Sequence, residues 1–198
     1  MRYFIGFLVT IGLLILLVVL LLTGGHGGNG GQKIPTTGEK PKTTSELAAY
    51  ADTGAAVRLI IDGPINADEI HTAVRITVDQ QDVTYEQIQG YQGTVVNTQV
   101  YASNQSAYSN FLYALGHGGF TLGDDNPKLT NEKGYCPLGQ RFVFELRDGD
   151  HDIERYWATS CGHSAPKTYK GSLQLTLSLF QAQVPDYTDL TQNLENLR

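Results

Sequence analysis

Apolar residues begin the chain in one unbroken run. Residues 3–22 contain no charged residue and no proline. A helix rises ~1.5 Å per residue, so a run of this length spans the ~30 Å hydrocarbon core of a bilayer. We therefore expect residues 1–22 to be a transmembrane anchor that binds the lipid bilayer through residues 3–22. A cleaved signal peptide stays open as the alternative, because Thr23, Gly24 and Gly25 form a weak cleavage site.

The pattern changes abruptly after Leu22. Residues 23–45 are polar and small, with a Gly-rich stretch over residues 24–31 followed by Pro35, Pro41 and several threonines. Glycine loses the most backbone entropy when it is ordered, and nothing in this segment can bury enough apolar surface to compensate. The composition predicts a disordered, flexible tether with a root-mean-square reach of ~25 Å.

Residues 46–198 carry the patterns of a folded domain, beginning with strands. A short helix is expected at 46–50, and the β-branched run 57–61 is typical of a strand. Residues 71–79 alternate between apolar and polar positions, which predicts a half-buried strand. Residues 83–88 and 94–102 are two more strand candidates.

Helical spacing follows. Tyr108, Phe111, Leu112 and Leu115 lie on one face of a predicted helix over 106–115, which Gly116 would end. Residues 172–184 fit either a strand or a helix, since their leucines alternate but also share a helical face. Their Leu, Gln and Ala content favours the helix. A terminal helix is expected at 188–197.

The clearest local signal is a hairpin near the middle of the domain. Residues 141–147 and 153–159 are two strand-like runs that flank a polar loop at 148–152. Pairing about residue 150 brings Cys136 close to Cys161 at the open end of the hairpin. We expect a disulfide between these two residues, which requires an oxidising compartment. Two unpaired buried thiols are the alternative.

Together these elements predict an α+β domain. An antiparallel sheet of about five strands would be covered on one face by the helices at 106–115 and 172–184. The domain would span residues 46–198, after the anchor at 1–22 and the tether at 23–45.

Composition narrows the possible partners. The chain has 14 Lys and Arg against 20 Asp and Glu, a net charge of −6. Four of the basic residues (Arg2, Lys33, Lys40 and Lys42) precede residue 46, so the folded domain is more acidic than the whole. An acidic surface argues against nucleic acid, whose phosphates require clustered Lys and Arg.

Orientation in the membrane rests on two observations. Arg2 adjoins the apolar run, whereas the ten residues after Leu22 contain no Lys or Arg. Counted over a longer window, Lys33, Lys40 and Lys42 would favour the opposite orientation. We give Arg2 and the expected disulfide more weight. The N-terminus is therefore predicted to be cytoplasmic and the domain extracytoplasmic at the cell membrane.

Few residues suggest catalysis. His117 lies in a Gly-rich stretch, and His163 lies in a sequence that resembles a nucleophile elbow but has Pro166 where the second glycine belongs. Asp124 belongs to a carboxylate pair in the same loop region. A surface hydrolase built from loops 116–134 and 161–167 is therefore the alternative function, with His117 or His163 as the base. No metal or cofactor is expected, because no His, Cys or acidic spacing matches a known metal site.

Aromatic residues suggest binding instead. Tyr91, Tyr101 and Tyr113 lie near many Asn and Gln residues around the expected passage from strand to helix. Tyrosine presents a large amphipathic surface and loses little entropy on contact. We therefore expect a tethered binding domain or a component of an envelope complex, with a protein or glycan as its ligand. A purely structural surface protein is a further alternative.

Overall fold

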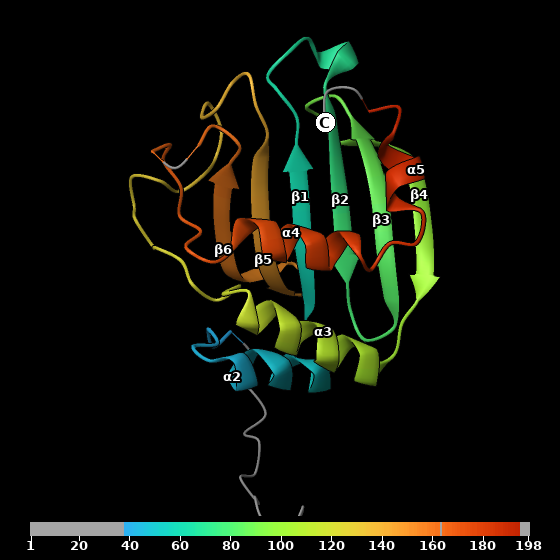
Figure 1. Cartoon of the computed structure of the whole chain (residues 1–198), viewed down its shortest axis with the longest axis vertical. Coiled ribbons are helices and arrows are strands. Elements are labelled where there is room, and N and C mark those ends of the chain that lie inside the picture. The colour runs from blue at the N-terminus through green and yellow to red at the C-terminus, as the bar shows by residue number, and fades with distance from the viewer. Residues whose placement is uncertain (1–37, 163, 195–198) are drawn as a thin grey trace, which may run out of the picture. The chain divides into compact units, whose positions relative to one another are not determined.

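A computed structural model describes residues 38–162 and 164–194. Its centre is one six-stranded sheet in the order β4-β3-β2-β1-β5-β6, in which all neighbouring strands are antiparallel (Figure 1). The strands are β1 (Ala56–Asp62), β2 (Thr72–Val78), β3 (Asp82–Gln89), β4 (Thr94–Ala102), β5 (Arg141–Asp148) and β6 (His151–Thr159). The predicted α+β fold is confirmed, with six strands rather than about five.

Helices lie on one side of this sheet. They are α2 (Thr44–Ala48), α3 (Gln105–His117), α4 (Leu173–Gln181) and α5 (Tyr187–Thr191), with 3-10 turns η1 (Ala49–Asp52) and η2 (Asp68–Ile70). Helix α4 crosses the sheet, and α2 runs beside α3 at one end of it (Figure 1). The helix favoured for residues 172–184 is present as α4, which covers Leu173–Gln181, and the strand alternative is wrong. Helix α3 passes through Gly116 and ends at His117, so the expected stop at Gly116 is wrong.

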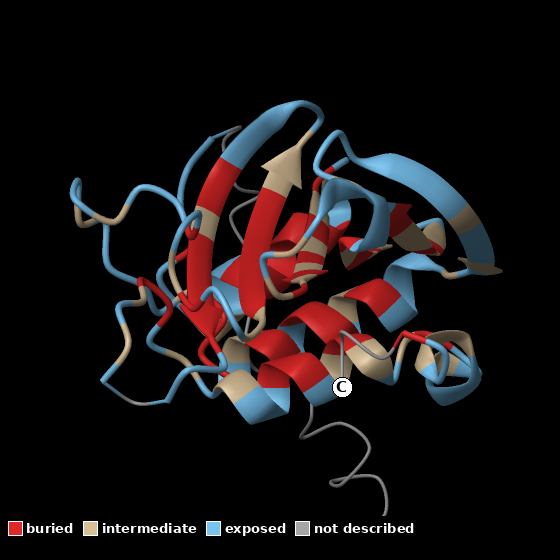
Figure 2. Ribbon diagram, turned by 90° about the horizontal axis from the view of Figure 1, so that it is seen from above, coloured by how far each residue is buried: buried red, intermediate tan, exposed pale blue. Residues whose placement is uncertain are grey.

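The core fills the space between the sheet and the helices (Figure 2). The side chains of β1 alternate between the two faces of the sheet. Val57, Leu59 and Ile61 are buried in the core, while the residues between them are partly exposed. Phe111 and Phe180, from α3 and α4, meet edge to face with ring centroids 5.2 Å apart. Burying these apolar side chains is the main force that holds the helices on the sheet.

Charged residues in register cross the other face of the sheet. Arg58 of β1 lies opposite Glu145 of β5, which lies opposite Arg155 of β6. Glu145 is 3.5 Å from Arg58 and 3.4 Å from Arg155. These cross-strand pairs help to fix the register of β1, β5 and β6.

The predicted hairpin and disulfide are both present. Strands β5 and β6 meet at a tighter turn than expected, with Asp148 paired to His151, and a register shift at Leu146/Arg147 takes up the difference. Cys136 and Cys161 form a disulfide with their Cα atoms 5.7 Å apart. It closes the open end of the hairpin, as the spacing predicted.

The anchor and most of the tether lie outside the described residues, which include only 38–45 of the tether. Within the described part of the chain, no helix is long and apolar enough to cross a membrane. The expected terminal helix at 188–197 is shorter in the structure, where α5 covers Tyr187–Thr191.

Candidate functional site

The most exposed strand of the sheet is the edge strand β4. Its nine residues contain no Lys, Arg, Asp or Glu. Val95, Val96 and Val100 are 40%, 49% and 58% exposed. Figure 2 shows β4, at the right, as an almost entirely exposed strand beside a largely buried sheet. An uncharged and exposed edge of this kind is a template for pairing with another strand.

The backbone of β4 is paired on one side only. Its one neighbour in the sheet is β3, and across the described residues no further backbone hydrogen bond reaches β4. Pairing with β3 is regular from Asn97 to Ala102, and a register shift opposite Gln87/Ile88 leaves Val96 as an extra residue between Val95 and Asn97. This bulge is one of the devices that protect natural edges. It leaves a regular six-residue stretch of outer N–H and C=O groups open.

The other edge of the sheet, β6, is covered. The amide nitrogens of Thr168 and Tyr169 both donate to the Trp157 carbonyl at 2.9 Å, and the Thr168 hydroxyl accepts from the Trp157 amide at 2.8 Å. Trp157 is 1% exposed, stacks on Tyr135 and donates from its indole nitrogen to the Leu129 carbonyl. The chain that follows β6 therefore folds back and covers the β6 edge.

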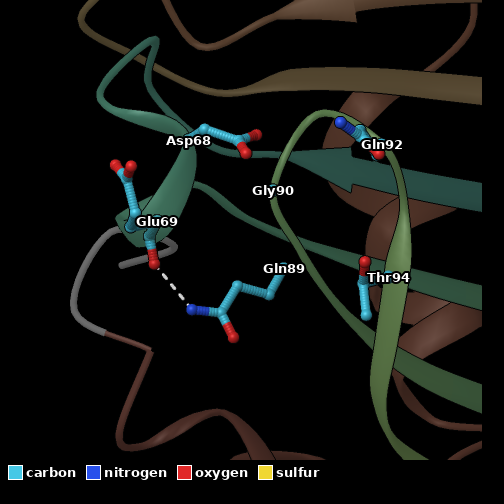
Figure 3. A pocket seen from close by; sticks show the side chains of 6 residues that line it. All are labelled: Asp68, Glu69, Gln89, Gly90, Gln92 and Thr94. Atoms are coloured by element: carbon cyan, nitrogen blue, oxygen red, sulfur yellow. Dashed lines mark hydrogen bonds between the residues drawn. The ribbon is translucent and has the colours of Figure 1, made fainter.

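A small acidic pocket lies at the Thr94 end of β4 (Figure 3). It has a volume of about 300 Å³, and Asp68 and Glu69 of η2 line it opposite Gln92 and Thr94. One Asp68 oxygen accepts a 2.6 Å hydrogen bond from the Tyr91 amide, and the Gln89 side chain donates to the Glu69 carbonyl. None of the Lys, Arg or His side chains that the structure describes forms an ion pair with either carboxylate. The pocket is therefore a site of uncompensated negative charge.

Tyr91, one of the predicted binding residues, covers a buried polar group beside this pocket. Its ring stacks on His71 at 4.0 Å, and His71 is 3% exposed. The His71 ring nitrogens lie 2.8 Å from Asp62 Oδ1 and 3.2 Å from the Pro64 carbonyl oxygen. Asp62 also forms a 2.7 Å ion pair with the buried Arg141. Tyr91 therefore anchors the turn before β4 to a rigid base.

The other two predicted tyrosines lie elsewhere. Tyr101 is on β4, half-buried, with its hydroxyl 3.4 Å from the Pro185 carbonyl oxygen. Tyr113 is exposed on α3 and contacts His117 edge to face at 4.6 Å. The three tyrosines thus occupy three different elements with different neighbours. Their role in binding stays a prediction.

The candidate catalytic residues are not joined by any contact that the structure describes. His117 is exposed in the last turn of α3, and Asp124 is exposed in the loop that follows. His163 lies outside the described residues. The first loop contacts the residues just after the second, since the Asp124 amide donates to the Thr168 carbonyl at 2.9 Å and Gly123 pairs with Tyr169. The hydrolase hypothesis stays a prediction.

A groove of about 670 Å³ lies between α4 and the ends of β1, β5 and β6. Ile61, Phe142 and Ala158 form its buried floor, while Gln140, Ser160, Gln174, Gln181 and Lys167 surround its opening. Gly162 and Lys167 come from the second of the two loops, but no residue of 116–134 lines it. Leu173, Leu177 and Tyr187 add apolar side chains to its wall, so its lining is mixed polar and apolar.

A buried carboxyl with a raised pKa lies on the helix side of the sheet. Glu154 of β6 is 3% exposed, and burial raises its pKa from 4.5 to about 7, with Lys40 opposing and Asp125 adding to the shift. Lys40 forms a 2.9 Å ion pair with Asp125 and lies over the Tyr156 ring.

Within the described ranges, no group of three His, Cys, Asp or Glu residues could hold a metal ion.

Comparison with known proteins adds no family to this description. No family model matches the chain, and no curated protein matches it significantly. Sequence reasoning missed Asp68, Glu69 and the edge position of β4, although the absence of charge over 94–102 was a readable signal.

Proposed function

We propose that the protein is a membrane-tethered, extracytoplasmic domain that binds another protein, as a component of an envelope complex. The open edge of β4 carries this proposal. An extended peptide offers N–H and C=O groups at the spacing of a strand, so it can add to β4 as a seventh strand. A glycan has no such repeat, and this favours the protein over the glycan ligand.

The tether and the disulfide support the location. The Gly-rich composition of residues 24–31 predicts a tether that keeps the domain within reach of the bilayer surface. A disulfide is stable in an oxidising compartment, which agrees with an extracytoplasmic domain. A C-terminal alkaline phosphatase fusion tests this orientation, since the enzyme is active only after export. An inactive but intact fusion would contradict the proposed location.

Site-specific photo-crosslinking in intact cells tests the binding. A photoreactive phenylalanine analogue replaces Thr98 of β4 in the full-length chain, and the same analogue at exposed Leu122 is the control. We expect a discrete cross-linked protein from position 98 alone, identified by mass spectrometry and lost when Val100→Lys is added. Equal products from both positions, or none from position 98, would contradict the proposal.

A further inference from the structure

The β4 edge and the acidic pocket next to it form one continuous surface, and this surface specifies its partner. The regular part of β4 runs from Asn97 to Ala102, and the pocket begins at Thr94. Since every pair of neighbouring strands in this sheet is antiparallel, an added strand is expected to run antiparallel to β4. Its C-terminal end then lies at the pocket.

Charge selects the side chain at that end. Asp68 and Glu69 line the pocket without a described cationic partner, and Gln92 and Thr94 add hydrogen-bonding groups opposite them. A Lys or Arg is the side chain that complements two carboxylates. Along β4 itself, exposed Val95, Val96 and Val100 favour small apolar and β-branched side chains on the added strand.

A second copy of this chain fits the surface poorly. Antiparallel pairing of β4 with itself would bring the Ala102 end of one copy to the Thr94 end of the other. Asp82 pairs with Ala102, so that arrangement would place an acid of one copy near Asp68 and Glu69 of the other. Two chains of net charge −6 also repel each other.

From this geometry we infer that β4 receives an extended segment of another protein, with alternating β-branched residues and a Lys or Arg at its C-terminal end, which enters the pocket lined by Asp68 and Glu69. This inference rests on the proposed function and adds the orientation and charge of the ligand. The Tyr91 ring, stacked on His71, holds the turn between pocket and strand in place.

Three blocked peptides test the inference against the full-length protein in mild detergent. Each has the same alternating Val and Thr core, with one Lys after the core, one Lys before it, or Gln at both positions. We expect the peptide with the C-terminal Lys to bind about fivefold more tightly than the other two, as one partly exposed ion pair permits. Raising the salt concentration should remove the difference.

Two matched variants locate the charge effect. Glu69→Gln should abolish the preference for the C-terminal Lys. The double variant Asp68→Asn, Glu69→Gln should abolish it too, and the side-chain oxygen at position 68 can still accept the hydrogen bond from the Tyr91 amide. Asp150→Asn removes one acidic charge from the hairpin turn between β5 and β6 and should leave the preference intact.

Each contrary outcome has a distinct meaning. Equal binding of all three peptides would overturn the inference but leave strand addition, and thus the proposed function, standing. Preference for the N-terminal Lys would overturn the antiparallel orientation. Dimers that Val100→Lys dissociates in sedimentation would identify a second copy as the occupant and overturn the inference. If no peptide binds, the inference fails, and the proposed function fails with it only if the cross-link from position 98 is also absent.

Discussion

The two edge strands, β4 and β6, have the same length and opposite surroundings. Both contain nine residues, but β6 carries His151, Asp152, Glu154 and Arg155, whereas β4 carries no charge. The chain after β6 returns to bond the Trp157 backbone, and the disulfide holds the start of that return in place. Nothing comparable covers the outer side of β4 in the residues that the structure describes. One sheet thus has an edge stabilised by its own chain and an edge available to another.

The difference shows where stability and binding are separated. Side chains that support β6 are buried and should affect the free energy of unfolding strongly when they are changed. Side chains on the outer part of β4 are solvated and should affect it weakly, although they should control binding.

Removing Trp157 should have the largest effect. Trp157→Ala deletes a side chain that is 1% exposed, its stacking on Tyr135 and its hydrogen bond to the Leu129 carbonyl. We expect a loss of about 3–5 kcal/mol in the free energy of unfolding, measured by urea denaturation. Leu138→Ala, at a residue 90% exposed, should change it by less than about 0.5 kcal/mol. A similar loss in both variants would show that the cover over β6 is not a packed structure.

Breaking the disulfide should loosen the segment that follows β6 and covers its edge. Replacing both Cys136 and Cys161 with Ser opens a loop with a sequence separation of 25 residues. The chain-entropy model gives a loss of about 3 kcal/mol. Amide exchange at Trp157 should accelerate while that of the central strand β1 changes only in proportion to global stability. Unchanged stability after replacement would contradict the role of this bridge.

Glu154 should make stability depend on pH. Its carboxyl has a pKa of about 7 in the folded state against 4.5 ordinarily, so the folded protein binds this proton more tightly than the unfolded chain. Stability should therefore fall as the pH rises from about 4.5 to 7, by up to about 3 kcal/mol at ~1.4 kcal/mol per pKa unit. Glu154→Gln should flatten this slope and stabilise the protein at pH 8. Parallel pH profiles of variant and parent would contradict the assignment.

A charge on β4 should change stability least and binding most. Val100→Lys places an ammonium on a residue that is 58% exposed, so we expect a stability change within about 0.5 kcal/mol. Charged edge residues oppose strand addition, and peptide binding should fall at least tenfold. Leu122→Lys, at a residue 53% exposed, should preserve binding. Unchanged peptide binding in Val100→Lys would contradict the proposal that the peptide adds to β4.

The helices and strands could be predicted from the sequence better than the order of the strands in the sheet. Alternation at 71–79 and the pairing about residue 150 depend on neighbours close in sequence, and both the strand and the disulfide are present. The candidate site could not be predicted in the same way. Whether 94–102 lies at an edge depends on where β5 and β6 pair, and the approach of Asp68 to the turn at Tyr91 is a tertiary contact. Glu154 likewise shows no sign in the sequence of the burial that perturbs it.

Amide hydrogen exchange, resolved residue by residue with and without the C-terminal Lys peptide, tests the central claim most directly. In the free full-length protein, alternate amides from Asn97 to Ala102 should exchange rapidly while the Trp157 amide is protected. Saturating peptide should protect those β4 amides and leave Trp157 unchanged. Protection of β4 before any peptide is added, or rapid exchange at saturation, would contradict an open edge that accepts a strand.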